Sequence, residues 1–328
     1  MELAARLLDA VGGNGTRLRW RWNQRRRDLG ESGLKASILW RSARTRHKMC
    51  PSCRALVARG ASRCPSCDAS VAGVAAPGFT RLLANLLPGA TTATGLILLA
   101  NGFWFVLALM VLLRTGDDAG FMGVLMFPGW FQSTLSDFGA LSTPLVLGAG
   151  EWWRLIPPIF LHGGLIHFFF NSYILLQLSR TVEEEYGTHR MLTAYLLTGI
   201  GGFLTTLVWS LVSGPKMSVG GSGAVIGLMG LLLAYGVRVG GGIGARVKAA
   251  IGQYVIYLFL ISLLFRGVDH AAHIGGFVSG FALGWVLPYG TYRTTGQRVR
   301  WEAVTYLLAL LTVLSWVQVA LQFPSRGG

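Results

Sequence analysis

Apolar segments long enough to cross a bilayer recur along the chain from about Thr94 onward. A transmembrane helix needs about 20 mainly apolar residues, and seven stretches reach or approach that length. They are residues 94–113, 165–181, 191–212, 222–239, 247–264, 270–287 and 302–321. The pattern predicts an all-α, multi-pass membrane domain over residues 94–322.

The composition supports this prediction, and the charge distribution adds an orientation. The chain is 52% hydrophobic and 13% charged, with a net charge of +15, whereas soluble chains carry about 25% charged residues. Sixteen of its 29 Lys and Arg residues lie before residue 82, and eight more lie in or beside the connections after the second, fourth and sixth stretches. The positive-inside rule then predicts a cell-membrane protein with a cytoplasmic N-terminus and an external C-terminus. A basic surface facing anionic lipid accounts for the charge with fewer assumptions than nucleic-acid binding by residues 1–48.

The four cysteines of the chain form two Cys-x-x-Cys pairs separated by ten residues. This spacing can present four thiolates to a structural zinc ion; the alternative is a pair of disulfides. Disulfides rarely persist in the cytoplasm, where this segment is expected, so zinc is favoured. We expect a basic segment over 1–48, a zinc-ribbon-like module over 49–72 and a linker over 73–93, with the zinc held by Cys50, Cys53, Cys64 and Cys67. With no open ligand position, the module would serve structure or a cytoplasmic protein partner.

One serine, Ser222, lies among four glycines at the start of an apolar stretch, in the sequence Val-Gly-Gly-Ser-Gly-Ala-Val-Ile-Gly over residues 219–227. Glycines allow a sharp turn and a close approach of backbone to another group. The serine could cap a helix, its glycines could pack against a neighbouring helix, or its hydroxyl could be a nucleophile beside backbone oxyanion donors.

Histidines in two other apolar stretches supply the base that a serine nucleophile needs. His167 and Asn171 are four residues apart and share one helix face. His273 stands just before a stripe of glycines at every fourth position, which allows very close helix contact. A histidine pKa suits a general base at neutral pH. Each of these histidines could instead only hydrogen-bond a neighbouring helix.

Together these motifs resemble those of the rhomboid intramembrane serine proteases, in the form with six core spans and one extra C-terminal span. The resemblance covers about residues 94–321. Its motifs are Gly220-x-Ser222-Gly223-Ala224-x-x-Gly227, Ala272-His273-x-Gly275-Gly276, His162 with His167 and Asn171, and Trp153-Arg154.

The resemblance implies an endopeptidase that cleaves transmembrane segments near the outer face, with Ser222 and His273 as a dyad and no third acidic member. It implies that His167, Asn171 and the Ser222 backbone N–H stabilise the oxyanion. It places Trp153-Arg154 in a membrane-embedded loop and makes Glu183 a structural acid. No cofactor is implied for catalysis.

One departure from the family pattern concerns the position four residues after the serine. Active rhomboids often carry an aromatic residue there, stacked on the catalytic imidazole, and this chain has Ile226. The orientation of the imidazole must then depend on other packing. The alternative function is a catalytically weak or inactive relative that binds membrane clients, although such relatives typically lack the serine or the histidine, and this chain has both. A metalloprotease would need a motif such as His-Glu-x-x-His, which this sequence lacks. A transporter would be expected to show internal repeats, and we find none.

Overall fold

The computed structural model describes residues 47–50, 55–58, 61, 63–67, 91–115, 132–263, 267–290, 292 and 294–323. The chain divides into two compact units, residues 1–74 and 75–328. Cys53, most of the basic segment, most of the linker and the apolar part of the connection after the first span lie outside the described residues.

The described part of the first unit is a two-stranded antiparallel sheet with cysteines beside it. β1 (His47–Met49) pairs with β2 (Leu56–Ala58). Cys50 follows β1 directly and is buried together with Val57 and Cys64. A small sheet of this kind has too little apolar core to be stable alone, so cross-links or a bound metal are expected to stabilise it.

The second unit is a helical bundle, and its long helices match the seven apolar stretches. Among the described residues, the helices of 17 residues or more are α4 (Thr92–Thr115), α8 (Leu165–Tyr186), α9 (Thr188–Ser213), α10 (Ser222–Val239), α11 (Gly241–Ser262), α12 (His270–Val286) and α13 (Thr295–Gln322). Five of them are long and apolar enough to cross a membrane: α4, α9, α10, α11 and α13. The other two are α12, which has 17 residues, and α8, which is interrupted by polar side chains.

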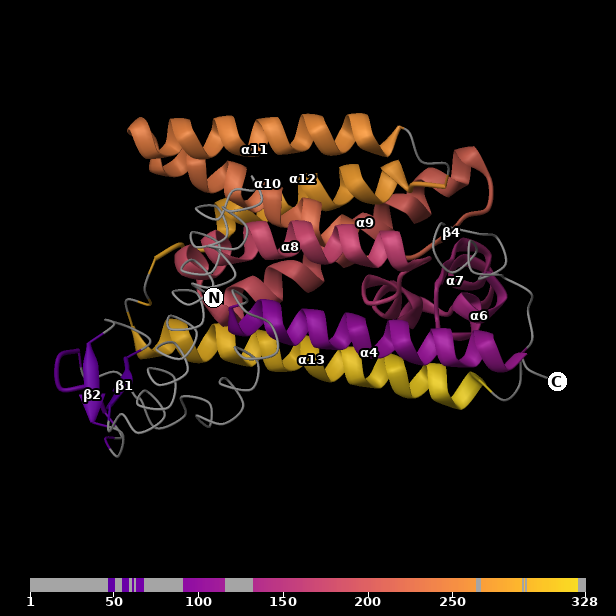
Figure 1. Ribbon diagram of the computed structural model, residues 1–328, viewed down its shortest axis with the longest axis horizontal. Helices are drawn as coiled ribbons and strands as arrows, with labels where there is room; N and C mark the ends of the chain where they lie inside the picture. Colours follow the sequence, from indigo (N-terminus) through magenta and orange to yellow (C-terminus); the bar gives the residue numbers. More distant parts are fainter. Residues whose placement is uncertain are drawn as a thin grey trace, which may run out of the picture. The chain divides into compact units, whose positions relative to one another are not determined.

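The helices differ in how much of their surface the protein covers. About two thirds of the apolar window of α10 is buried, whereas only 11% is buried in α11 and 22% in α13. In Figure 1 α10 and α12 lie between α11 on one side and the pair α4 and α13 on the other. The exposed apolar faces of α11 and α13 are the surfaces that a bilayer would cover.

Short elements connect α4 to α8 and reach the loop in front of α10. They are α6 (Gln132–Asp137), β3 (Leu141–Ser142), α7 (Thr143–Ala149) and the 3₁₀ turns η2 (Trp152–Leu155) and η3 (Pro157–Ile159). β3 pairs antiparallel with β4 (Met217–Ser218), which stands four residues before α10. The ladder fixes the path of the chain just before Ser222.

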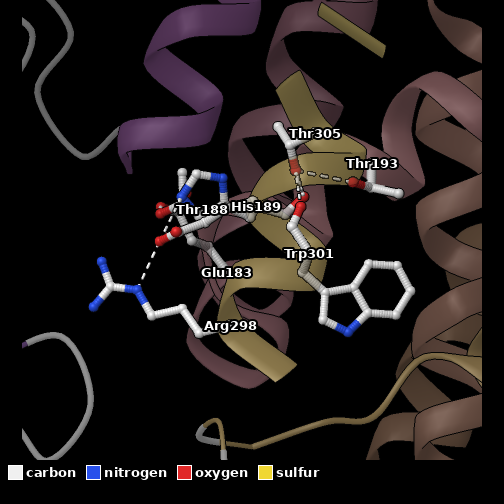
Figure 2. A network of polar contacts seen from close by, with 8 residues as sticks. Glu183, Thr188, His189, Thr193, Arg298, Trp301 and Thr305 are labelled. Atoms are coloured by element: carbon white, nitrogen blue, oxygen red, sulfur yellow. Dashed lines mark hydrogen bonds and ion pairs between the residues drawn. The ribbon is translucent and has the colours of Figure 1, made fainter. Parts of the chain in front are cut away.

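Polar contacts hold the N-terminal part of α13 against the start of α9 (Figure 2). The Thr305 hydroxyl lies 3.0 Å from the carbonyl oxygen of His189 and 3.1 Å from the hydroxyl of Thr193. Glu302 accepts a hydrogen bond from Arg298 at 2.6 Å, and its Oε1 lies 3.8 Å from His189 Nε2. Side-chain hydrogen bonds between helices are one of the ways in which membrane helices associate.

Candidate active site

Ser222 is the first residue of α10 and follows a tight turn that only glycine fits. Gly220 has a φ of 131°, which is unfavourable for residues with a side chain. A Cβ atom there would lie 2.6 Å from Cε1 and 2.7 Å from Nε2 of His167. The Gly220 N–H donates to the carbonyl of Pro158 at 2.8 Å, which fixes the turn to η3.

The close approach of α10 to α12 places the serine beside a histidine. Cβ atoms added at Gly276 and Gly280 of α12 would overlap with the carbonyl oxygens of Gly223 and Gly227 of α10. The two backbones therefore touch directly, without intervening side chains. We call this contact the glycine seam, defined by Gly223, Gly227, Gly276 and Gly280.

At the end of the glycine seam, Ser222 Oγ lies 2.9 Å from Nε2 of His273. This distance is within the range for a nucleophile and its general base. Both residues are partly exposed, so the pair is not sealed in the core. The two residues expected from the sequence to act together are thus adjacent in the structure.

His167 lies on the other side of the serine turn, and its tautomer follows from a backbone contact. The Gly163 N–H donates to Nδ1 of His167 at 3.3 Å. A neutral ring that accepts at Nδ1 carries its proton on Nε2, the atom that approaches Gly220. His167 therefore presents an N–H donor next to the serine turn.

Asn171 is buried one turn further along α8. Its side-chain nitrogen donates to the backbone carbonyl of His167 at 3.1 Å. This bond uses one of the two amide N–H groups and holds the side chain against its own helix.

His162 packs against His167 with ring centroids 5.2 Å apart. Burial, with a smaller contribution from His167, lowers the pKa of His162 well below its usual value, so this imidazole is neutral at pH 7.

A cavity of about 190 Å³ adjoins His273 between α10, α11 and α12. Ile226, Met229, Phe259 and His270 contribute to its almost entirely apolar lining. The side chain of Ile226, the residue that departs from the family pattern, therefore faces open space. The His270 ring lies edge-to-face with His273, with centroids 6.2 Å apart.

The residues assigned structural roles lie in the scaffold around the site. The Arg154 side chain is 1% exposed and donates to the carbonyls of Ser136 and Ala140 at 2.9 and 3.0 Å. It anchors the loop before α8 from inside the protein. Glu183 accepts a hydrogen bond from the Ala93 N–H at 2.9 Å, which joins α8 to the first turn of α4.

Sequence reasoning assigned no role to Asp269, which caps the helix that carries His273. Its Oδ1 accepts from the Ala272 N–H at 3.0 Å, and its Oδ2 accepts from Thr206 on α9 at 2.7 Å. An Asp directly before an apolar helix is a helix-start signal, so the sequence contained the information for the cap. The partner on α9 could not be read from it.

The cysteines of the first unit form a separate cluster. The sulfur atoms of Cys50, Cys64 and Cys67 all lie within 4.8 Å of one another, and Cys50 and Cys67 are 3.6 Å apart. A tetrahedral zinc site with Zn–S bonds of about 2.3 Å places its sulfurs about 3.8 Å apart, whereas a disulfide bond is about 2.05 Å long. The three described thiols fit a metal site and could hold one ion.

Comparison with known proteins shows what the region around this site is similar to. Residues 149–290 match the Rhomboid domain family. The chain is 34% identical to Rhomboid protease GluP of Bacillus subtilis (strain 168), over 59% of this chain and 36% of the relative. It is 32% identical to RHOMBOID-like protein 2 of Arabidopsis thaliana, over 60% of this chain and 65% of the relative. It is 35% identical to Rhomboid-like protease 2 of Toxoplasma gondii, over 46% of this chain and 53% of the relative. The chain thus spans less than two thirds of the length of each relative.

Proposed function

We propose, from the premise that residues 149–290 of this chain are a rhomboid domain, that the protein is an intramembrane serine endopeptidase. Its substrates are transmembrane segments of other membrane proteins. The observation that carries the proposal is the 2.9 Å contact between Ser222 Oγ and His273 Nε2. Two of the similar proteins are named as proteases, which supports the same assignment.

In the proposed reaction Ser222 Oγ attacks the scissile carbonyl while its proton passes to Nε2 of His273. The tetrahedral intermediate collapses as the imidazolium returns that proton to the leaving amine, which leaves an acyl-enzyme. Water, deprotonated by His273, then hydrolyses the ester. The substrate helix must first unwind locally, because a carbonyl within a helix is hydrogen-bonded and shielded.

The oxyanion would be stabilised by the Ser222 backbone N–H, by His167 and by Asn171. The Nε2 atom of His167 lies beside the serine turn, which supports its role as a donor. Asn171 would contribute either its second N–H or a rotated amide, since one N–H bonds the helix backbone. Preorganised donors of this kind contribute about 10²–10³ in rate each.

The experiment that tests the dyad is labelling of membranes with a fluorophosphonate probe, together with cleavage of a model transmembrane substrate. Ser222→Ala and His273→Ala should each abolish both signals, and the double variant should be no worse than either one. His270→Ala is the matched control on the same helix and should keep most of the activity. A wild-type protein that is not labelled, yet binds membrane clients, would favour the alternative of an inactive relative.

We infer an orientation with the N-terminus in the cytoplasm, so that the Ser222 end of α10 opens to the outer face and water reaches it from there. The basic residues before α4 and in the connections after α8, α10 and α12 support this assignment. A reporter fused after Gly328 that is active only in the cytoplasm would contradict it.

For the first unit we propose one structural zinc ion held by Cys50, Cys53, Cys64 and Cys67. The supporting observation is the cluster of three thiols with metal-like spacing. The zinc would fix the fold of a cytoplasmic module that binds a protein partner. Elemental analysis of the purified protein that finds no zinc would overturn the assignment.

A further inference from the structure

The start of α12, which carries His273, is fixed by a carboxylate that lies outside the Ser–His pair. Asp269 accepts a hydrogen bond from the Ala272 N–H at 3.0 Å through one oxygen. Its other oxygen accepts from the Thr206 hydroxyl at 2.7 Å. The cap is therefore held by a residue of another helix.

Thr206 and its neighbour Gly202 bring α9 against α12 just before the histidine. The Thr206 side chain is 1% exposed, so its bond to Asp269 is shielded from competing solvent. A Cβ atom at Gly202 would lie 2.7 Å from the carbonyl oxygen of Ala272, the residue before His273. The position of His273 thus depends on the α9 contact on one side and on the glycine seam on the other.

The charge of Asp269 matters because His273 lies in the first turns of α12. The N-terminal end of a helix carries a partial positive charge, which disfavours a second positive charge there. His273 becomes an imidazolium when it takes the proton of Ser222. The Asp269 carboxylate interacts electrostatically with this imidazole, and a negative charge stabilises the imidazolium against the helix end.

We propose that Asp269, held by Thr206, is a positioning residue for the reaction: it orients α12 and supplies the counter-charge to the His273 imidazolium. This inference rests on the proposed protease function. The proton stays on His273 until it passes to the leaving amine. The other titratable groups that interact with His273 are His270 on α12 and His167 on α8.

The test is the rate of fluorophosphonate labelling of Ser222, measured across pH on the full-length protein in membranes. Asp269→Asn keeps an oxygen for the cap and removes the charge. We expect labelling to slow about tenfold, which is a fraction of the 10²–10⁴-fold rate enhancement that a general base contributes. The acidic limb of the rate profile should move to lower pH, because the imidazolium loses its counter-charge. KM for a transmembrane substrate should stay unchanged.

A matched pair at Thr206 separates positioning from folding. Thr206→Val loses the hydroxyl and should slow labelling several-fold, whereas Thr206→Ser keeps it and should label at the wild-type rate. A purely structural role would lower the thermal unfolding midpoint of Asp269→Asn while the folded protein kept the wild-type pH profile.

The outcomes distinguish the two proposals. Ser222-dependent labelling of the wild type, with the same rate and pH profile in Asp269→Asn, would overturn the role of Asp269 and leave the protease assignment standing. A wild-type protein that is not labelled at Ser222 would overturn both.

Discussion

Two helix contacts in this bundle are built in opposite ways. At the glycine seam α10 and α12 meet backbone to backbone, and a methyl group on Gly276 or Gly280 would overlap a carbonyl oxygen. Where α9 meets the N-terminal part of α13, side chains form the contact through the hydroxyls of Thr193 and Thr305 (Figure 2).

The difference shows that the glycine seam sets the distance between Ser222 and His273, whereas the polar contact only holds α13 in place. Association of helices in lipid depends on close packing and on hydrogen bonds, because lipid tails are as apolar as the side chains. A backbone contact has no side-chain rotamer through which to adjust, so its separation is fixed. Contacts through hydroxyls tolerate small shifts. The seam carries the Ser222–His273 pair, whereas the polar contact anchors a peripheral helix.

Breaking the seam should have the largest effect. Gly280→Ala places a methyl group against the Gly227 carbonyl, and neither backbone can yield without moving its helix. We expect a loss of stability of about 3 kcal/mol and a fall in Ser222 labelling of about 10²-fold, as expected for a misplacement of about 1 Å. Thermal unfolding measures the loss of stability, and fluorophosphonate labelling measures the reactivity of Ser222.

The control for this change is Gly252→Ala on α11, where an added Cβ meets nothing within 4 Å. It should leave stability and labelling within error of the wild type. If Gly280→Ala behaved like this control, the seam would not set the distance between serine and histidine.

Removing a hydroxyl from the polar contact should have a moderate effect. Thr305→Val loses the bonds to His189 and Thr193, and we expect a cost of about 1 kcal/mol in thermal unfolding. Labelling of Ser222 should be unchanged. Thr312→Val is the matched control, since the hydroxyl of Thr312 bonds to Leu308 of its own helix. Equal losses from the two variants would show that the bond between α9 and α13 contributes nothing.

Filling the cavity beside His273 should have the smallest effect. Ile226→Phe adds a ring where α10 faces about 190 Å³ of apolar space, away from the seam. We expect a gain in stability of up to about 1 kcal/mol from the added aromatic contacts, measured as a higher unfolding midpoint. A loss as large as that of Gly280→Ala would mean that this face of α10 is as tightly constrained as the seam.

The helices could be predicted from the sequence because membrane length and apolarity are local properties. The fourth stretch was expected at residues 222–239, and α10 has these bounds. The expected start of the last span at residue 302 was seven residues late, since α13 begins at Thr295. Its first turns carry Arg298 and Arg300, and apolarity cannot detect helical turns that lie outside the hydrocarbon.

The site could be predicted less completely, because its distances depend on contacts between helices. Ser222 and His273 were named from their motifs, and the structure places them in contact. The bond between Asp269 and Thr206 joins residues on different helices, and no local pattern indicates it. The orientation of Asn171 toward its own helix is likewise set by packing around α8.

The small ladder of β3 and β4 has a consequence for the order in which the chain is assembled. Leu141 and Ser142 are synthesised before α8 and α9, and their partners Ser218 and Met217 come after both helices. Unpaired backbone groups are costly in a bilayer, so the ladder closes only when the α8–α9 hairpin has inserted and returned the chain to the same face. The turn that presents Ser222 is completed with that closure. A nascent chain that has not finished α9 therefore lacks the turn that would present the Ser222 hydroxyl in the proposed reaction.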